Sequence, residues 1–276
     1  MAPPADQSEI PLDGGHTNDA VVRVGATVRR ATSAQTATIH RLLTHARGQG
    51  VAWVPRVHGT DERGREVLDF IDGEVPHGEP SWLWADQVLV QVAQALREWH
   101  DATATFARSS QDVWWQPPRE PADVICHGDF APYNHVFRDG HLVGAIDFDT
   151  CLPAPRMWDL AWTAYRYVPL RPSATAHVDD GPGADRTLLP ASALRERLDL
   201  LLEAYGPLDH PGEVGPARPF NAGELLAWVP ERLHAIAHWG EGQDDPDHQR
   251  WAAMYRAHAH WVSTGERLAS PGSLGA

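Results

Sequence analysis

The chain contains no lysine, so the 23 basic residues that face its 37 aspartates and glutamates are all arginines. The formal net charge of the 276 residues is −14. Proteins that bind nucleic acid need basic surface to neutralise phosphates, so this charge disfavours a nucleic acid as partner. An acidic surface attracts cationic substrates and also serves general solubility, and both explanations of the charge stay open.

Cysteine is nearly absent as well, since Cys126 and Cys151 are the two in the chain. Two are too few for a disulfide framework or a zinc site, and nothing near them indicates an activated thiolate. We therefore predict two buried small side chains and a reducing, cytoplasmic setting. No window approaches 18 uninterrupted apolar residues, which argues against a membrane span. The first fifteen residues lack the apolar segment of a signal peptide.

The first 73 residues are predicted to form a small, strand-rich unit. Strands over 21–24 and 27–30 flank Gly25-Ala26, a connection suited to a type II′ hairpin. A weakly amphipathic helix over 36–47 follows, with Gly48 after its end. Two more strands are expected over 56–60 and 65–71.

Beyond Gly73 the apolar spacing becomes helical. We predict four helices, three of them with a start or stop signal of their own. The fold class that results is α+β, with two lobes, Met1–Gly73 and Glu74–Ala276, and an exposed loop over 172–190. Ser81 is the expected cap of a helix that reaches Trp99, and Gly206-Pro207 follows an apolar stripe over 194–205. Asn221 and Glu224 form a capping box before Pro230, which should kink or split its helix. A last apolar stripe covers 251–262.

The segment over 124–161 carries the chemistry. Asp139-Gly140 between alternating apolar residues predicts a type I′ hairpin. In that register Arg138 pairs with His141, Asn134 faces Ala145, and Asp147 lies two residues further on the face of Asn134. Such diagonal neighbours are about 7–8 Å apart, close enough for a magnesium ion to bridge their side-chain oxygens.

Asp129 precedes the hairpin and approaches the same place from its loop. Phosphoryl transfer needs this set of groups, because the protein has to position the reactants and neutralise phosphate charge with metal. One carboxylate accepts the proton of the attacking hydroxyl, while another carboxylate and an amide hold Mg²⁺.

The pattern His127-Gly128-Asp129 with Asn134 five residues later resembles the catalytic loop of protein kinases. Ile146-Asp147-Phe148 is similar to their metal-binding segment, with Asp149 where that segment has glycine. Glycine after the histidine, and Trp158-Asp159-Leu160-Ala161 downstream, make the resemblance closer to aminoglycoside phosphotransferases and choline-kinase-like enzymes.

This resemblance implies a bilobal, protein-kinase-like fold and a role for each motif residue. By it, Asp129 is the catalytic base, and Asn134 and Asp147 are the Mg²⁺ ligands. His127 braces the catalytic loop, and Asp159 ties that loop to the following helix.

The small lobe departs from the family. There, a strand lysine contacts the nucleotide phosphates and a glutamate on the lobe's helix holds it. Here Arg30 falls nearest the lysine position, and no Asp or Glu occurs from 20 to 60, so we expect Arg30 to have no such partner.

Two further segments are expected at the nucleotide. The glycines of 14–18 are a candidate phosphate-covering loop. Asp69-Phe70-Ile71 is the candidate linker between the lobes, whose backbone would hydrogen-bond the edge of the base.

The expected function is transfer of the γ-phosphoryl group of ATP or GTP to a hydroxyl of a small molecule, aminoglycoside-like or another hydroxylated and possibly cationic metabolite. Mg²⁺ is the expected cofactor. A rival is a weak or silent kinase-like protein that binds nucleotide or ligand, which the missing lysine and glutamate favour. A magnesium-dependent hydrolase is a third reading, but it gives no reason for the Asp129-to-Asn134 spacing.

Overall fold

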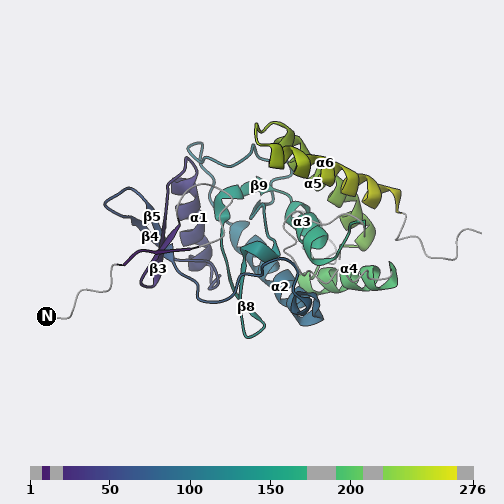
Figure 1. Ribbon diagram of the computed structural model, residues 1–276, viewed down its shortest axis with the longest axis horizontal. Coiled ribbons are helices and arrows are strands. Elements are labelled where there is room, and N and C mark those ends of the chain that lie inside the picture. The colour runs from purple at the N-terminus through teal and green to yellow at the C-terminus, as the bar shows by residue number, and fades with distance from the viewer. Residues whose placement is uncertain (1–7, 13–20, 173–190, 208–219, 266–276) are drawn as a thin grey trace, which may run out of the picture.

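The computed structural model describes residues 8–12, 21–172, 191–207 and 220–265. In Figure 1 an antiparallel sheet with one helix lies at one end of the molecule, and the remaining helices occupy the other end. Short strands and loops, together with the start of the helix Met157–Tyr167, carry the motif residues of 124–161.

The sheet has five strands in the order β1-β2-β3-β5-β4, and all neighbours are antiparallel. Val24 pairs with Thr27, which confirms the two-residue connection Gly25-Ala26. The helix between β3 and β4 is also confirmed. The bounds are β1 Ile10–Pro11, β2 Val22–Val24, β3 Thr27–Arg30, α1 Thr36–Gly48, β4 Val57–Thr60 and β5 Glu66–Asp69.

The rest of the described chain is mainly helical, with two small antiparallel ribbons, β6-β9 and β7-β8. In chain order the elements are η1 Ser81–Trp84, α2 Asp86–Thr103, β6 Val124–Cys126, η2 Pro132–Asn134, β7 His135–Arg138, β8 His141–Ala145, η3 Phe148–Thr150, β9 Leu152–Ala154, α3 Met157–Tyr167, α4 Ala191–Tyr205, α5 Ala222–Glu241 and α6 Pro246–Thr264.

One predicted helix start is wrong. Ser81 begins a short 3-10 helix, and α2 starts at Asp86 after an extended Ala85, because the turn at 81–84 does not continue into the helix. Pro230 does not split its helix, since α5 runs through it from Ala222 to Glu241. The predicted cap of α5 is confirmed, because the Asn221 side chain accepts the Glu224 N–H at 2.9 Å.

Helix α2 is the central packing element. Its Leu89, Leu96 and Trp99 are fully buried, and it packs against α1, α4 and β6 (Figure 1). Because one apolar core runs from α1 across α2 to α5 and α6, the two parts of the molecule share a single interior. No helix in the described ranges combines the length and the apolarity that a membrane crossing requires.

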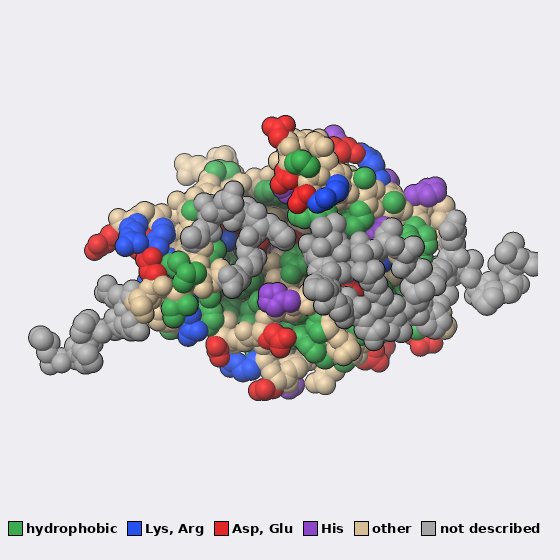
Figure 2. All heavy atoms as spheres, in the orientation of Figure 1, with side chains coloured by type: hydrophobic (Ala, Val, Ile, Leu, Met, Phe, Trp, Pro, Cys, Tyr) green, Lys and Arg blue, Asp and Glu red, His purple; other side chains and the backbone are tan. Residues whose placement is uncertain are grey.

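At the sheet end of the face shown in Figure 2, arginine and acidic side chains lie next to one another. Among the ion pairs of this region are Arg63 with Glu9 and Arg65 with Asp61, both at 2.9 Å. Arg63 is 70% exposed, and exposed pairs such as Arg63 with Glu9 contribute little to stability.

Three histidines of the helical part are buried and hydrogen-bonded to tyrosine hydroxyls: His100 to Tyr205, His135 to Tyr167, and His258 to Tyr165 at 2.7 Å. Burial lowers the pKa of each imidazole, and for His258 burial and the nearby Arg171 lower it to about 4. The fold therefore favours the neutral form of these rings.

We expect the protein to lose stability in mild acid. Because His258 is neutral when folded, the unfolded chain binds a proton first as the pH falls below about 6.5. The stabilisation from the neutral ring is complete above that pH and is lost towards pH 4, by roughly 3 kcal/mol for His258 alone. Urea unfolding at pH 7.5 and pH 4.5 measures the difference. In a His258→Gln variant the dependence should be flatter; an unchanged dependence would contradict the assignment to His258.

Candidate active site

The loop that follows β6 and carries His127, Gly128 and Asp129 is held in place by the buried carboxylate of Asp159. Asp159, in the first turn of α3, accepts the backbone N–H groups of His127 at 2.7 Å and of Gly128 at 2.9 Å. His100 of α2 lies 3.2 Å from the same carboxylate. Burial opposes its ionisation, but the hydrogen bonds from His100 and from the Gly128 N–H keep the pKa of Asp159 below its usual value.

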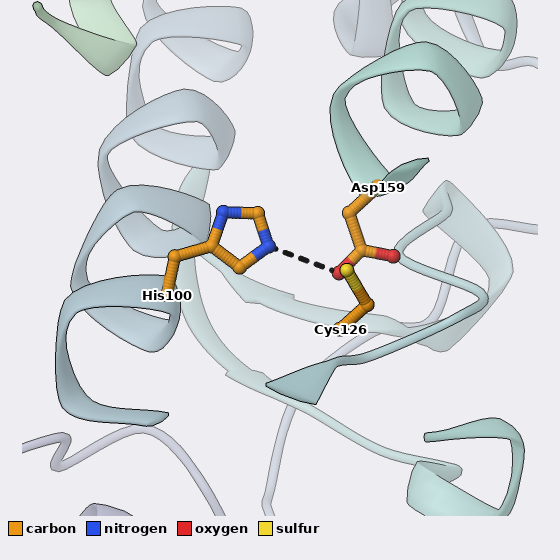
Figure 3. Close-up of side chains that lie close together, drawn as sticks. All are labelled: His100, Cys126 and Asp159. Atoms are coloured by element: carbon orange, nitrogen blue, oxygen red, sulfur yellow. Dashed lines mark hydrogen bonds and ion pairs between the residues drawn. The ribbon is translucent and has the colours of Figure 1, made fainter. Parts of the chain in front are cut away.

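Asp159, His100 and Cys126 meet in the interior, as Figure 3 shows. The three have the ligand types of a metal site, but their atoms are already engaged. Both Asp159 oxygens accept hydrogen bonds, the two His100 nitrogens contact Asp159 and Tyr205, and the Cys126 thiol donates to the Pro155 carbonyl. Burial raises the pKa of the Cys126 thiol well above its usual value, so it is not a thiolate. The cluster is a hydrogen-bonded brace, and the predicted burial of both cysteines is confirmed.

His127 contacts both sides of the loop. One ring nitrogen accepts the Asp129 N–H at 3.3 Å, and the other lies 3.2 Å from the Ile146 carbonyl at the end of the β7-β8 hairpin. The ring thereby joins the loop that carries Asp129 to the segment that carries Asp147.

The Asp129 carboxylate is held by three donors. Oδ1 accepts the Tyr133 hydroxyl at 2.6 Å and the Trp162 indole N–H at 2.7 Å, and Oδ2 accepts the Asn134 amide at 2.9 Å. Because an ionised carboxylate has about four acceptor sites, Oδ2 keeps one for a further donor. The carboxylate is therefore fixed in direction while one oxygen stays able to accept a proton.

Tyr133 and Trp162 were not predicted at this site. Nearly all of the Trp162 surface is buried, as in an ordinary core residue. The signal was present in the spacing: Trp162 lies three residues after Asp159 on α3, which places both side chains on the face that meets the loop.

Arg232 of α5 is a second residue that sequence reasoning missed. It is buried, donates to the Gly128 carbonyl at 2.6 Å, and lies over the rings of Trp158 and Trp162. Burial lowers the pKa of its guanidinium, although Asp129 and Asp159 oppose the shift. It ties α5 to the loop and places positive charge near Asp129.

The predicted hairpin exists, but its register differs. Arg138 pairs with His141 as predicted, whereas a bulge after Val136 makes Ala145 pair with His135. The Ile146 N–H therefore donates to the Asn134 carbonyl at 2.9 Å, so Asn134 lies one position closer to Asp147 than an unbulged ladder would place it. The extra residue in one strand, which no turn signal reveals, is the reason for the wrong pairing.

Asp147 leaves the strand in a left-handed conformation, with φ 62°, and begins η3. The alternation of a strand no longer applies to it, so its direction follows from this turn. About half of its side chain, 49%, is exposed. Partial burial and the neighbouring Asp149 raise the pKa of Asp147, against the opposing charge of Arg30.

The residues around Asp147 fit a divalent cation. The donors of this region are an amide and carboxylates, the hard oxygen ligands that Mg²⁺ prefers. Asp147 and Asp149 are neighbouring carboxylates, and a positive group, the Arg30 guanidinium, already contacts both. Asn134 and Asp147 can hold the ion, with Asp149 beside them.

The expectation that Arg30 has no acidic partner is wrong. Its Nε donates to Glu66 at 2.5 Å, and its terminal nitrogens lie 3.4 Å from Asp147 and 2.7 Å from Asp149. Glu66 lies directly opposite Arg30 in the β3-β5 ladder. The acidic partner, Glu66, thus lies on a neighbouring strand and not on the helix, and its position is outside residues 20–60.

The candidate linker is only partly available to a nucleotide. The N–H of Asp69 donates to Arg56, and that of Phe70 donates to Ala26 at 2.9 Å, while the Asp69 carboxylate contacts the Arg56 N–H and His58. Among the described residues, the Ile71 N–H has no backbone acceptor. The candidate phosphate-covering loop at 14–18 lies outside the described residues.

Comparison with known proteins agrees with this geometry. Residues 104–201 match the model of the phosphotransferase enzyme family, APH. The trifolitoxin immunity protein of Rhizobium leguminosarum bv. trifolii is 36% identical over 205 residues, which cover 72% of this chain and 74% of that protein. The chain belongs to the APH phosphotransferase family.

Solved structures show the same fold at low identity. A choline/ethanolamine kinase family protein from Mesorhizobium loti has a TM-score of 0.61 at 16% identity, covering 96% of this chain and 91% of that one. Choline kinase from Cryptosporidium parvum Iowa II has 0.61 at 12%, with coverage of 96% and 91%. The GDP and kanamycin complex of APH(2")-IIia has 0.56 at 14%, with 94% of each chain covered. The predicted α+β, protein-kinase-like fold is confirmed.

Gly128 and Gly140 offer a matched test of the loop. Both have positive φ, 83° and 76°, but a Cβ at Gly128 would overlap the Thr150 carbonyl, whereas a Cβ at Gly140 meets nothing. Each change to alanine introduces about 1–2 kcal/mol of backbone strain. We expect Gly128→Ala to cost about 2 kcal/mol more than Gly140→Ala, because the loop must also move. Urea unfolding of the two variants measures this, and equal losses would mean that the loop accommodates the methyl group.

Proposed function

We propose that this chain transfers the γ-phosphoryl group of ATP or GTP to a hydroxyl group of a small molecule. The observation that carries the proposal is the Asp129 carboxylate, fixed by three donors and linked through Asn134 to the segment of Asp147. Membership of a phosphotransferase family supports the reaction class.

In this proposal Asp129 is the catalytic base. Tyr133 and Trp162 occupy Oδ1, so Oδ2 is the oxygen that receives the proton of the acceptor hydroxyl as that oxygen attacks phosphorus. Asn134 holds Asp129 through its amide nitrogen, at 2.9 Å to the carboxylate and 3.0 Å to its backbone carbonyl, and keeps its amide oxygen for metal. Mg²⁺, held by Asn134 and Asp147, would neutralise charge on the phosphates.

His127 and Asp159 are proposed as supports of the loop, through the contacts described above. Arg30 is the proposed contact to the nucleotide phosphates, and the linker Asp69-Phe70-Ile71 the proposed contact to the base, with the Ile71 N–H as its donor. The proposed lobes are residues 1–73 and 74–276, with the nucleotide between them. Use of ATP or GTP places the activity in the cytoplasm.

Asp129→Asn should reduce turnover by about 10²-fold or more, because the amide cannot accept the hydroxyl proton. Nucleotide affinity should barely change. The assay incubates the pure protein with ATP or GTP, Mg²⁺ and a panel of hydroxylated metabolites and aminoglycosides. Asp139→Asn is the matched control, since Asp139 is exposed on the hairpin turn and asparagine accepts its φ of 51°. Near-full activity of Asp129→Asn would refute the assigned base.

Asp147→Ala should abolish magnesium-dependent nucleotide binding while leaving the fold intact, because the carboxylate is half-exposed and carries no packing of the core. Calorimetric titration of the protein with ATP or GTP, with and without Mg²⁺, measures the change. Asp72→Ala, which removes a carboxylate that is 76% exposed, serves as control. Unchanged magnesium-dependent binding in Asp147→Ala would show that the ion is held elsewhere.

A second candidate function is protection against a toxin, which the 36% identity to an immunity protein favours. The two functions are compatible if the toxin is the hydroxyl acceptor. Sensitive cells that express the wild-type chain or Asp129→Asn separate the cases. Protection by the wild type alone would link it to phosphoryl transfer, whereas equal protection by both would indicate a binding role, as in the silent-protein alternative.

A further inference from the structure

The most unusual arrangement in the described chain is the cluster around Glu66 on β5. Its side chain is 2% exposed, and each carboxylate oxygen has its own partner: Oε1 accepts Arg30 Nε at 2.5 Å, and Oε2 lies 2.9 Å from His40 Nε2 on α1. A buried carboxylate is stable only with such partners. Glu66 therefore joins the sheet to α1 through a strand arginine and a helix histidine.

The nitrogens of the Arg30 guanidinium have different partners on its two sides. Nε, the inner donor, is occupied by Glu66, while Nη1 and Nη2 extend across to Asp147 and Asp149. Arginine presents its five N–H donors in a rigid plane, so fixing Nε also fixes the direction of the two terminal nitrogens. The side that faces the candidate metal segment is the side that can bind phosphate oxygens.

The exposure of the three acids explains why Arg30 can exchange some of its partners. Asp149 and Asp147 are 38% and 49% exposed, so their contacts with Arg30 are open to water, whereas Glu66 is buried. The Glu66 contact is thus the persistent one, and the outer contacts can be replaced by phosphate.

We propose that Glu66 and His40 are positioning residues for the nucleotide phosphates. Glu66 holds Nε of Arg30, and His40 orients Glu66. The two terminal nitrogens of Arg30 bind phosphate oxygens when the nucleotide and the metal are bound at Asp147. The proposal rests on the proposed function. In this proposal the phosphate-binding Arg30 is supported by Glu66 of strand β5 and His40 of helix α1. Helix α1 therefore does not need an acidic residue of its own.

The test compares binding of Mg²⁺-ATP and Mg²⁺-GTP with binding of adenosine and guanosine, by calorimetric titration. Glu66→Gln keeps the shape and one acceptor oxygen but removes the charge. We expect it to weaken triphosphate binding about 10-fold, the usual size of one charge-assisted hydrogen bond, and to leave nucleoside binding unchanged. Glu9→Gln is the matched control, because Glu9 pairs with Arg63 and Arg65 at the sheet surface and its change should alter neither affinity.

His40 supplies a graded version of the same test. His40→Leu removes the donor to Glu66 and should weaken triphosphate binding about 3- to 10-fold. His40→Gln keeps a donor at that position and should recover most of the loss. Arg30→Ala should lower triphosphate affinity roughly 10- to 100-fold, while Arg29→Ala should not, since Arg29 contacts Thr27 and lies 3.8 Å from Asp61.

The outcomes distinguish the proposed function from the positioning role of Glu66 and His40. Absence of Mg²⁺-ATP and Mg²⁺-GTP binding by the wild-type protein would overturn the proposed function. Wild-type binding with no triphosphate loss in Glu66→Gln would overturn the positioning role alone. Equal losses for triphosphate and nucleoside would overturn it too, because they would show that Glu66 supports only the fold of the sheet.

Discussion

The carboxylate of Asp159 lies in the interior of the helical part and accepts the backbone N–H groups that open the loop of His127, Gly128 and Asp129. Two consecutive amides on one carboxylate fix both the position and the tilt of that loop. The side chain of Asp129 then meets three donors, two from η2 and one from α3, and His127 reaches the end of the hairpin. Each contact uses the geometry set by the one before, so the site depends on a carboxylate that is itself fully buried.

The buried charge is tolerable because its surroundings are complete. A carboxylate without partners in such an interior would be protonated or would destabilise the fold. Here His100 adds a third donor, and Tyr205 in turn binds the other nitrogen of His100. The contacts run from Tyr205 of α4 through His100 of α2 to Asp159 and the loop. The conformation of the loop therefore depends on how these helices pack.

Local signals in the sequence predicted much of this structure. The Asp139-Gly140 turn, the Gly25-Ala26 connection and the cap at Asn221 each depend on a few adjacent residues, and each was found as predicted. The failures involve contacts between residues far apart in sequence. Glu66 meets Arg30 across a ladder, Trp162 meets Asp129 across a helix–loop contact, and the bulge after Val136 has no sequence signal of its own.

Under the proposed role of Arg30, the absence of lysine also determines which reagents can label the nucleotide site. The chain has no side-chain primary amine at all, so nucleotide analogues that carry acylating or aldehyde groups have no lysine to modify there. A guanidinium condenses instead with vicinal dicarbonyl reagents, so a reagent of that class, and not one that targets amines, would label Arg30.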